Sequence, residues 1–183
     1  ATHDVTFTVI PPDTEPPVTT SDIPEGWVDG PVLVTLTATD AISDIAGIWY
    51  STSGGSTYNL YVNPFTVSAE GRTTVMYYAR DARNNQESPK TEYLDIDESP
   101  PVTTTSNTDG STYSGDALVQ LHPTDTYSGV AQTYWKLDSG TWQTGTQAYT
   151  PIWGWHTLYY YSVDNVGKAE TVKSTTFRVK LLT

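Results

Sequence analysis

Apolar and polar residues alternate with a period of two along several short segments. From Val32 to Thr39, Val34, Leu36 and Ala38 alternate with polar threonines, which predicts a strand with one buried and one solvated face. Three further strands of this kind follow, and Ser53-Gly54-Gly55 reads as a hairpin turn between two of them. Their core-facing residues are Ala46, Ile48, Tyr50, Val75, Tyr77, Ala79, Leu94 and Ile96. Short strands separated by turns predict an antiparallel β-sandwich.

The same pattern occurs a second time in the chain. Three blocks recur in the same order, at offsets of 84, 85 and 83 residues: 13–20 with 97–104, 37–46 with 122–131, and 77–81 with 160–164. The core-facing residues of the second copy are Val119, Leu121, Ala131, Thr133, Trp135, Leu158, Tyr160, Ser162, Phe177 and Val179, with a turn at Asp138-Ser139-Gly140. A repeat of this kind predicts two copies of one domain.

The repeat sets the expected domain organisation. We expect repeat 1 to span 13–97 and repeat 2 to span 98–183, with residues 1–12 as the last strand of a preceding repeat or an extra N-terminal strand. The segment before Asp13 resembles the segment before Asp97, so we interpret the chain as an excerpt of a longer array. Each repeat begins with a Pro-Pro pair, which favours an extended linker.

Composition narrows the classes of function. The formal net charge is −12, which argues against nucleic acid as a partner. No apolar stretch is long enough to span a membrane, so no membrane insertion is expected. The chain has no Cys, which excludes disulfides, thiolate catalysis and Cys-based zinc sites. Thr, Tyr, Val and Trp favour strands, so no helix longer than about three turns is expected.

Four motifs carry a resemblance to a known class of domain. They are the D-x-x-P-P linker at 13–17, the A-T-D-x-x-S turn at 38–45, the D-x-G-x-W hairpin at 138–142, and the Y-Y-x-x-D…E segment at 160–170. In these motifs the chain resembles the immunoglobulin-like repeats of bacterial and archaeal extracellular proteins, which are related in shape to fibronectin type III domains. The resemblance covers nearly all of both copies. It implies two tandem immunoglobulin-like sandwiches in an extracellular or cell-surface protein, and it says little about function.

Catalytic chemistry finds little support in the sequence. There is no G-x-S-x-G motif, and His3, His122 and His156 lie in three dissimilar contexts. The acidic residues fall in turns and linkers, where a soluble repeat places them. We therefore expect no enzyme activity and no organic cofactor.

The acidic turns form one candidate site. In an immunoglobulin-like sandwich the second and sixth strands run parallel, so the acids that follow them lie at one pole with the linker acids. Calcium prefers such oxygen ligands, and a site there would stiffen an array at the domain junction. The alternative is that the same aspartates cap turns by accepting backbone N–H bonds. The candidate residues are Asp13, Glu15, Asp40, Asp44, Asp81 and Glu87 in copy one, and Asp97, Glu98, Asp125, Asp164 and Glu170 in copy two.

The aromatic residues form the other candidate site. Strand parity places Tyr50 and Trp135 in the core, which sends their neighbours outward. Exposed aromatic rings on a flat sheet suit stacking on sugar rings. The alternatives are cross-strand pairing that shields an exposed sheet and burial against a neighbouring domain. The candidate carbohydrate-binding residues are Trp49, Tyr134, Trp142, Trp153 and Trp155.

These observations favour one function and leave one rival. The favoured function is a non-catalytic spacer or adhesion segment of a larger surface or secreted protein. Its partners would be neighbouring repeats of the same polypeptide, with a polysaccharide or another surface protein as further candidates. The rival is a carbohydrate-binding or accessory module attached to a polysaccharide-degrading enzyme.

Overall fold

The computed structural model describes residues 12–181, and all of its regular secondary structure is β-strand. The expected strand at 1–12 lies outside these residues, apart from Pro12. Contacts divide the chain into two compact units. One comprises the residues up to Glu25 together with Pro31–Leu94, and the other comprises Gly26–Gly30 together with the residues from Asp95 onward. Among the described residues no helix is long and apolar enough to cross a membrane.

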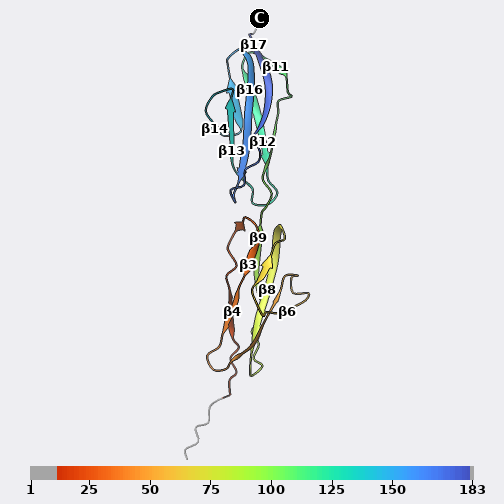
Figure 1. The fold of residues 1–183 in the computed structure, drawn as a ribbon, viewed down its shortest axis with the longest axis vertical. Helices are drawn as coiled ribbons and strands as arrows, with labels where there is room; N and C mark the ends of the chain where they lie inside the picture. Colours follow the sequence, from red (N-terminus) through yellow and green to blue (C-terminus); the bar gives the residue numbers. More distant parts are fainter. Residues whose placement is uncertain (1–11, 182–183) are drawn as a thin grey trace, which may run out of the picture. The chain divides into compact units, whose positions relative to one another are not determined.

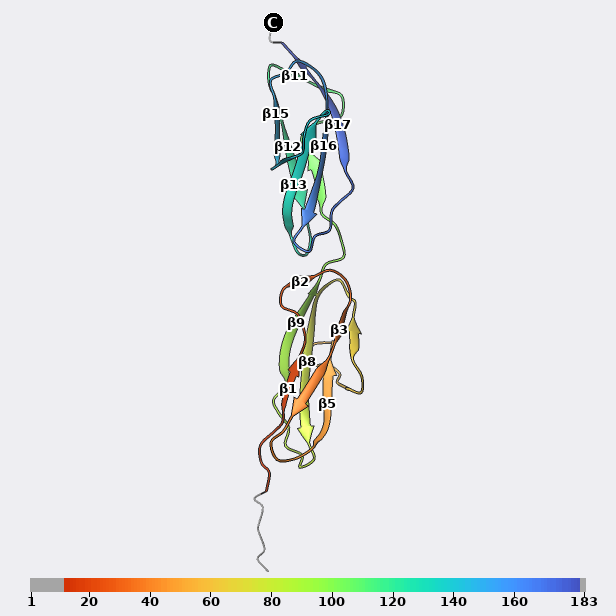
Figure 2. The same ribbon diagram turned by 60° about the vertical axis from the view of Figure 1, so that its left-hand side comes forward.

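The first repeat contains nine strands in two layers. They are β1 (Val18–Ser21), β2 (Trp27–Val28), β3 (Val32–Val34), β4 (Leu36–Thr39), β5 (Ile45–Ser51), β6 (Asn59–Leu60), β7 (Phe65–Val67), β8 (Gly71–Asp81) and β9 (Lys90–Ile96). One layer holds the pairs β1-β4 and β3-β7, and the other is a five-stranded sheet in the order β2-β9-β8-β5-β6. Strand β1 packs against β8 of the other layer (Figure 2).

The second repeat contains eight strands, also in two layers. They are β10 (Val102–Thr105), β11 (Ser111–Ser114), β12 (Ala117–Thr124), β13 (Val130–Leu137), β14 (Gln143–Thr144), β15 (Gln147–Thr150), β16 (Gly154–Asp164) and β17 (Lys173–Lys180). A three-stranded sheet in the order β10-β12-β15 faces a five-stranded sheet in the order β11-β17-β16-β13-β14. Figure 1 shows β13 beside β16 in the larger sheet.

This strand order is that of an immunoglobulin-type sandwich, which confirms the predicted all-β fold class. Strands β10, β12 and β15 take the places of A, B and E, and β13, β16 and β17 take those of C, F and G. Strands β1, β5, β8 and β9 lie 84, 85, 83 and 83 residues before β10, β13, β16 and β17. The sequence repeat is therefore a repeat of strands.

The predicted core lies between the two layers of each repeat. Fully buried side chains include Tyr77, Leu94 and Ile96 in the first repeat and Leu158 and Phe177 in the second. Trp135 packs against the core of the second repeat, as strand parity predicts. In the first repeat Tyr50 stacks on Phe65, with ring centroids 3.9 Å apart.

Two sequence-based expectations about the strands were wrong. Ala46 and Ala131 were expected to face the core and are exposed. Each lies in a β-bulge, where the register of β5 with β8 and of β13 with β16 shifts by one residue. The predicted strand over 32–39 is interrupted at Thr35, whose backbone N–H donates to Asp22 Oδ1 at 2.7 Å. Its two halves, β3 and β4, pair with different partners.

Candidate functional site

Three aspartates of the first repeat lie together at one end of its sandwich. Asp40 follows β4, Asp81 ends β8, and Asp13 precedes β1. Strands β1 and β4 are antiparallel, which brings the start of one beside the end of the other. One carboxylate oxygen from each aspartate lies within 4.8 Å of the other two. The sequence analysis expected these three aspartates at one pole, and the structure places them together there.

Asp40 and Asp81 are fixed by the turns in which they stand. Asp40 Oδ1 accepts the backbone N–H groups of Ile42 and Ser43 at 2.9 and 2.7 Å. Asp81 Oδ1 accepts those of Arg83 and Asn85, both at 2.8 Å. These are the bonds that the turn-capping alternative requires.

The side chain of Asn85 also connects Asp81 to Asp13. Asp13 Oδ1 accepts the backbone N–H of Glu15 at 3.1 Å. Asn85 Nδ2 donates to Asp81 Oδ2 at 2.7 Å and to the backbone carbonyl of Asp13 at 3.2 Å. The side chain of Asn85 therefore holds the segment before β1 against the turn after β8.

Asp97, Asp125 and Asp164 form the equivalent cluster in the second repeat. One carboxylate oxygen from each again lies within 4.8 Å of the other two. Asp125 Oδ1 accepts the backbone N–H groups of Tyr127 and Gly129 at 3.1 and 2.7 Å. Gly129 has a φ of +83°, a conformation that glycine adopts without strain.

The other two aspartates of this cluster are equally fixed. Asp164 Oδ1 accepts the N–H groups of Val166 and Lys168 at 3.0 and 2.8 Å. Asp97 Oδ1 accepts the N–H of Ser99 at 3.1 Å, and its Oδ2 accepts the N–H of Ser128 at 3.0 Å. Asp97 thereby joins the linker before β10 to the loop after β12.

Buried oxygen atoms without hydrogen-bond partners concentrate at these clusters. Within the described part of the chain, four buried side-chain polar atoms lack a partner. Three of them are Asp13 Oδ2, Asp164 Oδ2 and Ser128 Oγ, and the fourth is Trp135 Nε1. Asp13 is 9% exposed and Asp164 is 2% exposed. Buried polar atoms are normally paired with protein, water or an ion, so a bound ligand would satisfy these oxygens.

Hydrogen bonds favour the ionised forms of Asp40 and Asp81. Hydrogen bonds from the N–H groups of Ser43 and Ile42 lower the pKa of Asp40, although burial and the charge on Asp81 act against this. Burial favours the neutral form of Asp81, but hydrogen bonds, above all from Asn85, outweigh it and lower the pKa of Asp81 as well. Negative charges are thus held close together at neutral pH.

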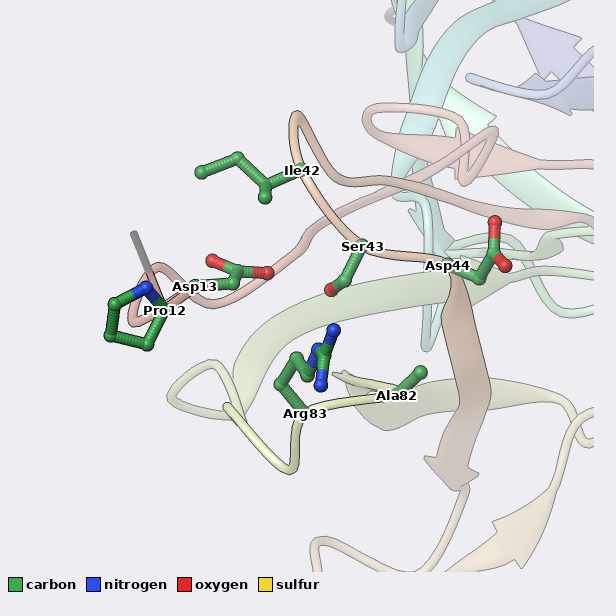
Figure 3. Close-up of a pocket in the computed structure, with 7 residues that line it drawn as sticks. All are labelled: Pro12, Asp13, Ile42, Ser43, Asp44, Ala82 and Arg83. Atoms are coloured by element: carbon green, nitrogen blue, oxygen red, sulfur yellow. The ribbon is translucent and has the colours of Figure 1, made fainter. Parts of the chain in front are cut away.

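A surface pocket opens beside the first cluster. It is lined by Pro12, Asp13, Ile42, Ser43, Asp44, Ala82 and Arg83 (Figure 3). In this view the carboxylate of Asp13 points toward Ser43, whereas that of Asp44 is turned away from it. The guanidinium of Arg83 lies below Ser43 in the same view. Asp44, a predicted ligand, is therefore not brought into the cluster.

Four other predicted ligands also lie outside the two clusters. Glu15 and Glu98 are exposed linker residues, and Glu87 and Glu170 are buried. The two buried glutamates were expected at the acidic pole. They instead turn toward the first strand of their repeat, because backbone N–H groups there need acceptors.

Glu170 holds β10, in one sheet, to β16 in the other. Its Oε1 accepts the backbone N–H of Ser162 at 2.9 Å, and its Oε2 accepts that of Thr103 at 3.0 Å. Lys173 pairs with Glu170 Oε2 at 2.7 Å and donates to the carbonyl of Thr103 at 2.9 Å. We call this arrangement the glutamate clamp of the second repeat.

The first repeat has an equivalent glutamate clamp. Glu87 accepts the backbone N–H groups of Ala79 at 2.9 Å and Thr19 at 3.2 Å, and also the hydroxyl of Thr19. Lys90 pairs with Glu87 at 3.4 Å and donates to the carbonyl of Thr19. Sequence reasoning missed the clamps, although the offset of 83 residues between Glu87 and Glu170 was a signal.

The predicted aromatic residues lie on the outer faces of the five-stranded sheets. Tyr134 stacks on Tyr161 with centroids 5.0 Å apart, and Trp142 meets Tyr161 edge-on at 5.0 Å. Trp49, in the first repeat, stacks on Tyr78 at 5.5 Å. Cross-strand pairing therefore accounts for much of this arrangement.

Two further tryptophans remain largely exposed. Trp155 is 61% exposed, and Arg178 lies 6.0 Å from its ring. Trp155 lies on the same face of β16 as Tyr161, and the two residues are about 20 Å apart along the strand. Trp153 is 69% exposed and precedes Gly154, the first residue of β16, whose φ of +133° interrupts the alternation there. The structure thus groups Tyr134 with Trp142 and places Trp155 further along the same face.

Of the three histidines, His156 has a structural role. Both ring nitrogens of buried His156 are bound, Nδ1 to Asp138 Oδ2 and Nε2 to the carbonyl of Ile152, each at 2.8 Å. His122 is exposed on β12, as predicted. His3 lies outside the described residues.

The sequence matches no family model and no curated protein. Among solved structures, it is similar to the fibronectin(III)-like modules of CbhA from Clostridium thermocellum, with 9% identity over 90% of this chain and 95% of that one and a TM-score of 0.43. It is also similar to the D00-D0 domain of intimin, with 10% identity, coverage of 87% and 99%, and a TM-score of 0.48. The three N-terminal domains of the outer capsid protein Hoc of bacteriophage RB49 are 7% identical, with coverage of 91% and 70% and a TM-score of 0.49. These similarities concern the fold alone.

Proposed function

We propose that this chain is a non-catalytic, load-bearing spacer segment of a larger extracellular or cell-surface protein. The observation that carries the proposal is the pairing of strands near the two ends of each repeat. Strand β11 lies parallel to the last strand, β17, over four residue pairs from Ser111↔Phe177 to Ser114↔Lys180. In the first repeat β2 lies parallel to β9 over two pairs.

Parallel strands near the ends of a domain resist tension well. A force that pulls the two ends apart loads the hydrogen bonds of such a pair together, in shear. An antiparallel pair joined by a hairpin, in contrast, opens one bond at a time. Forced unfolding depends on the barrier to unfolding, which rises when several bonds must break at once.

The glutamate clamps add a second connection of the same kind. In each repeat the strand that follows the Pro-Pro linker is tied by a buried glutamate to the longest strand of the opposite sheet. Tension that enters through the linker must break these bonds before β1 or β10 can detach. Thr103 and Ser162, which carry two of the bonds, are 1% and 0% exposed.

Single-molecule pulling on the chain between two handles tests the proposal. We expect two unfolding events, each releasing roughly 250 Å of chain for a repeat of about 80 residues. The second repeat should unfold at the higher force, because its parallel pair is longer. One smooth extension without separate events would refute the proposal.

A carbohydrate-binding module is the second candidate function. The observation in its favour is the row of rings on the outer sheet face of the second repeat, where Trp155 and Trp142 are 61% and 40% exposed. Retention on insoluble polysaccharides tests this candidate. Retention that Trp155→Ala abolishes would support it, with Leu118→Ala on the other sheet as a matched exposed apolar control. Failure of the wild-type chain to bind any polysaccharide in the panel would exclude it.

A further inference from the structure

We propose that each aspartate cluster is a calcium site, with Asp13, Asp40 and Asp81 holding one ion and Asp97, Asp125 and Asp164 holding the other. Two independent observations lead to this assignment. The first is the close approach of three carboxylates in each repeat, within 4.8 Å. The second is the set of buried oxygens without partners, one on Asp13 and one on Asp164.

In Asp13 and Asp164, turn capping uses one carboxylate oxygen and leaves the other without a partner. In Asp164, Oδ1 accepts both hydrogen bonds from the turn after β16, and Oδ2 is buried without a partner. Asp13 likewise accepts from Glu15 through Oδ1 and leaves Oδ2 unpaired. The turns orient the carboxylates, and the unpaired oxygens are left for an ion.

The donor set selects a hard divalent cation. All of the candidate ligands are oxygens, and no Cys or His takes part. Calcium accepts six to eight oxygens in flexible geometry, with backbone carbonyls, hydroxyls and water completing the shell. In the second repeat the unpaired hydroxyl of Ser128 is available beside Asp97, which binds the N–H of the same serine. Magnesium requires a tighter octahedral shell at shorter distances and fits such a site less well.

A bound ion would fasten the chain where it enters each repeat. Asp13 and Asp97 belong to the segments before β1 and β10, whereas their partners stand at the ends of strands of the sandwich or directly after them. Calcium would thus join the entering segment to two loops of the same repeat. This consequence is separate from the spacer function, because a spacer can carry load without a metal ion.

Calcium titration of the whole chain tests the proposal. After removal of metals with a chelator, we expect calorimetry to show two calcium ions bound per chain. At a calcium concentration of about a hundred times the dissociation constant of its site, the melting temperature of each repeat should rise by roughly 10–20 °C. Magnesium at the same concentration should have a much smaller effect.

Asparagine variants separate calcium binding from turn capping. Asp164→Asn keeps an Oδ1 acceptor for the turn and removes the charge, so it should lower the stoichiometry to one. Asp13→Asn should do the same for the other site. The matched control is Asp109→Asn, because Asp109 caps Thr176 at 2.7 Å and lies outside both clusters. It should still bind two ions.

Three outcomes would overturn the proposal. The first is no saturable binding of calcium by the wild-type chain. The second is two bound ions in a folded Asp164→Asn variant, with folding checked by circular dichroism. The third is equal stabilisation by magnesium and calcium, which would reject calcium as the ligand.

Discussion

Replacement of Glu170 by alanine should destabilise the second repeat by about 4 kcal/mol. The change leaves the backbone N–H groups of Ser162 and Thr103 without an acceptor in a site where both residues are at most 1% exposed. Each buried donor that loses its partner costs about 1–3 kcal/mol. The partly exposed ion pair with Lys173 adds at most about 1 kcal/mol.

Urea denaturation followed by circular dichroism measures this loss. Glu170→Gln keeps one carbonyl oxygen as an acceptor, so it should cost roughly half as much as the alanine variant. Glu25→Gln removes one negative charge from an exposed position and should change the free energy of unfolding by less than about 0.5 kcal/mol. A loss below about 1 kcal/mol in Glu170→Ala would refute the reasoning, because it would mean that water satisfies the two N–H groups.

Three further predictions concern packing and pH. Trp135→Ala should destabilise the second repeat by about 3 kcal/mol, measured by chemical denaturation. Trp142→Ala, at the exposed hairpin, should cost about 1 kcal/mol or less. Equal costs would contradict the assigned strand parity. Burial acts to lower the pKa of His156, but its hydrogen bonds to Asp138 and the Ile152 carbonyl prevail and raise it. The stabilisation of the fold by protonated His156 is complete below about pH 6.5 and is lost as pH rises through the folded-state pKa of His156. Melting temperatures should therefore fall over that range in the wild type and not in His156→Gln. Burial and the hydrogen bond to Glu92 raise the pKa of Tyr77 to about 12; the first repeat should therefore lose stability between about pH 10 and pH 12, and Tyr77→Phe should remove that part of the loss.

The repeat in the sequence predicted much of the fold. Because equivalent strands recur at nearly constant offsets, alternation in one copy could be checked against the other, as with Leu94 and Phe177. The same topology argument placed Asp40 beside Asp81, since the ends of parallel strands in a sandwich meet at one pole. The core and the two aspartate clusters could thus be predicted from the sequence.

Other features depend on contacts that the sequence pattern does not encode. A bulge inserts one residue into a strand, and nothing in the alternation around Ala46 or Ala131 marks it. The acceptor role of Glu170 depends on how closely β10 approaches β16, which only the packed sandwich determines. For the same reason Glu87 and Glu170 were grouped with the acidic turns, although each binds the backbone of a distant strand.

The unpaired oxygens of Asp13 and Asp164 could not be predicted from the sequence either. Residue type and spacing indicate that Asp164 stands in a turn, and turn capping was the simpler explanation. Only the hydrogen bonds show that Oδ1 of Asp164 accepts the N–H groups of the turn and that its Oδ2 is buried without a partner.

Single-molecule pulling on clamp variants tests the load-bearing role most directly. With Glu170→Ala, the account predicts that the unfolding force of the second repeat falls while that of the first repeat is unchanged. Glu87→Ala should give the reverse. The account would be contradicted if both variants unfolded at the forces of the wild-type chain, because the clamps would then carry no load.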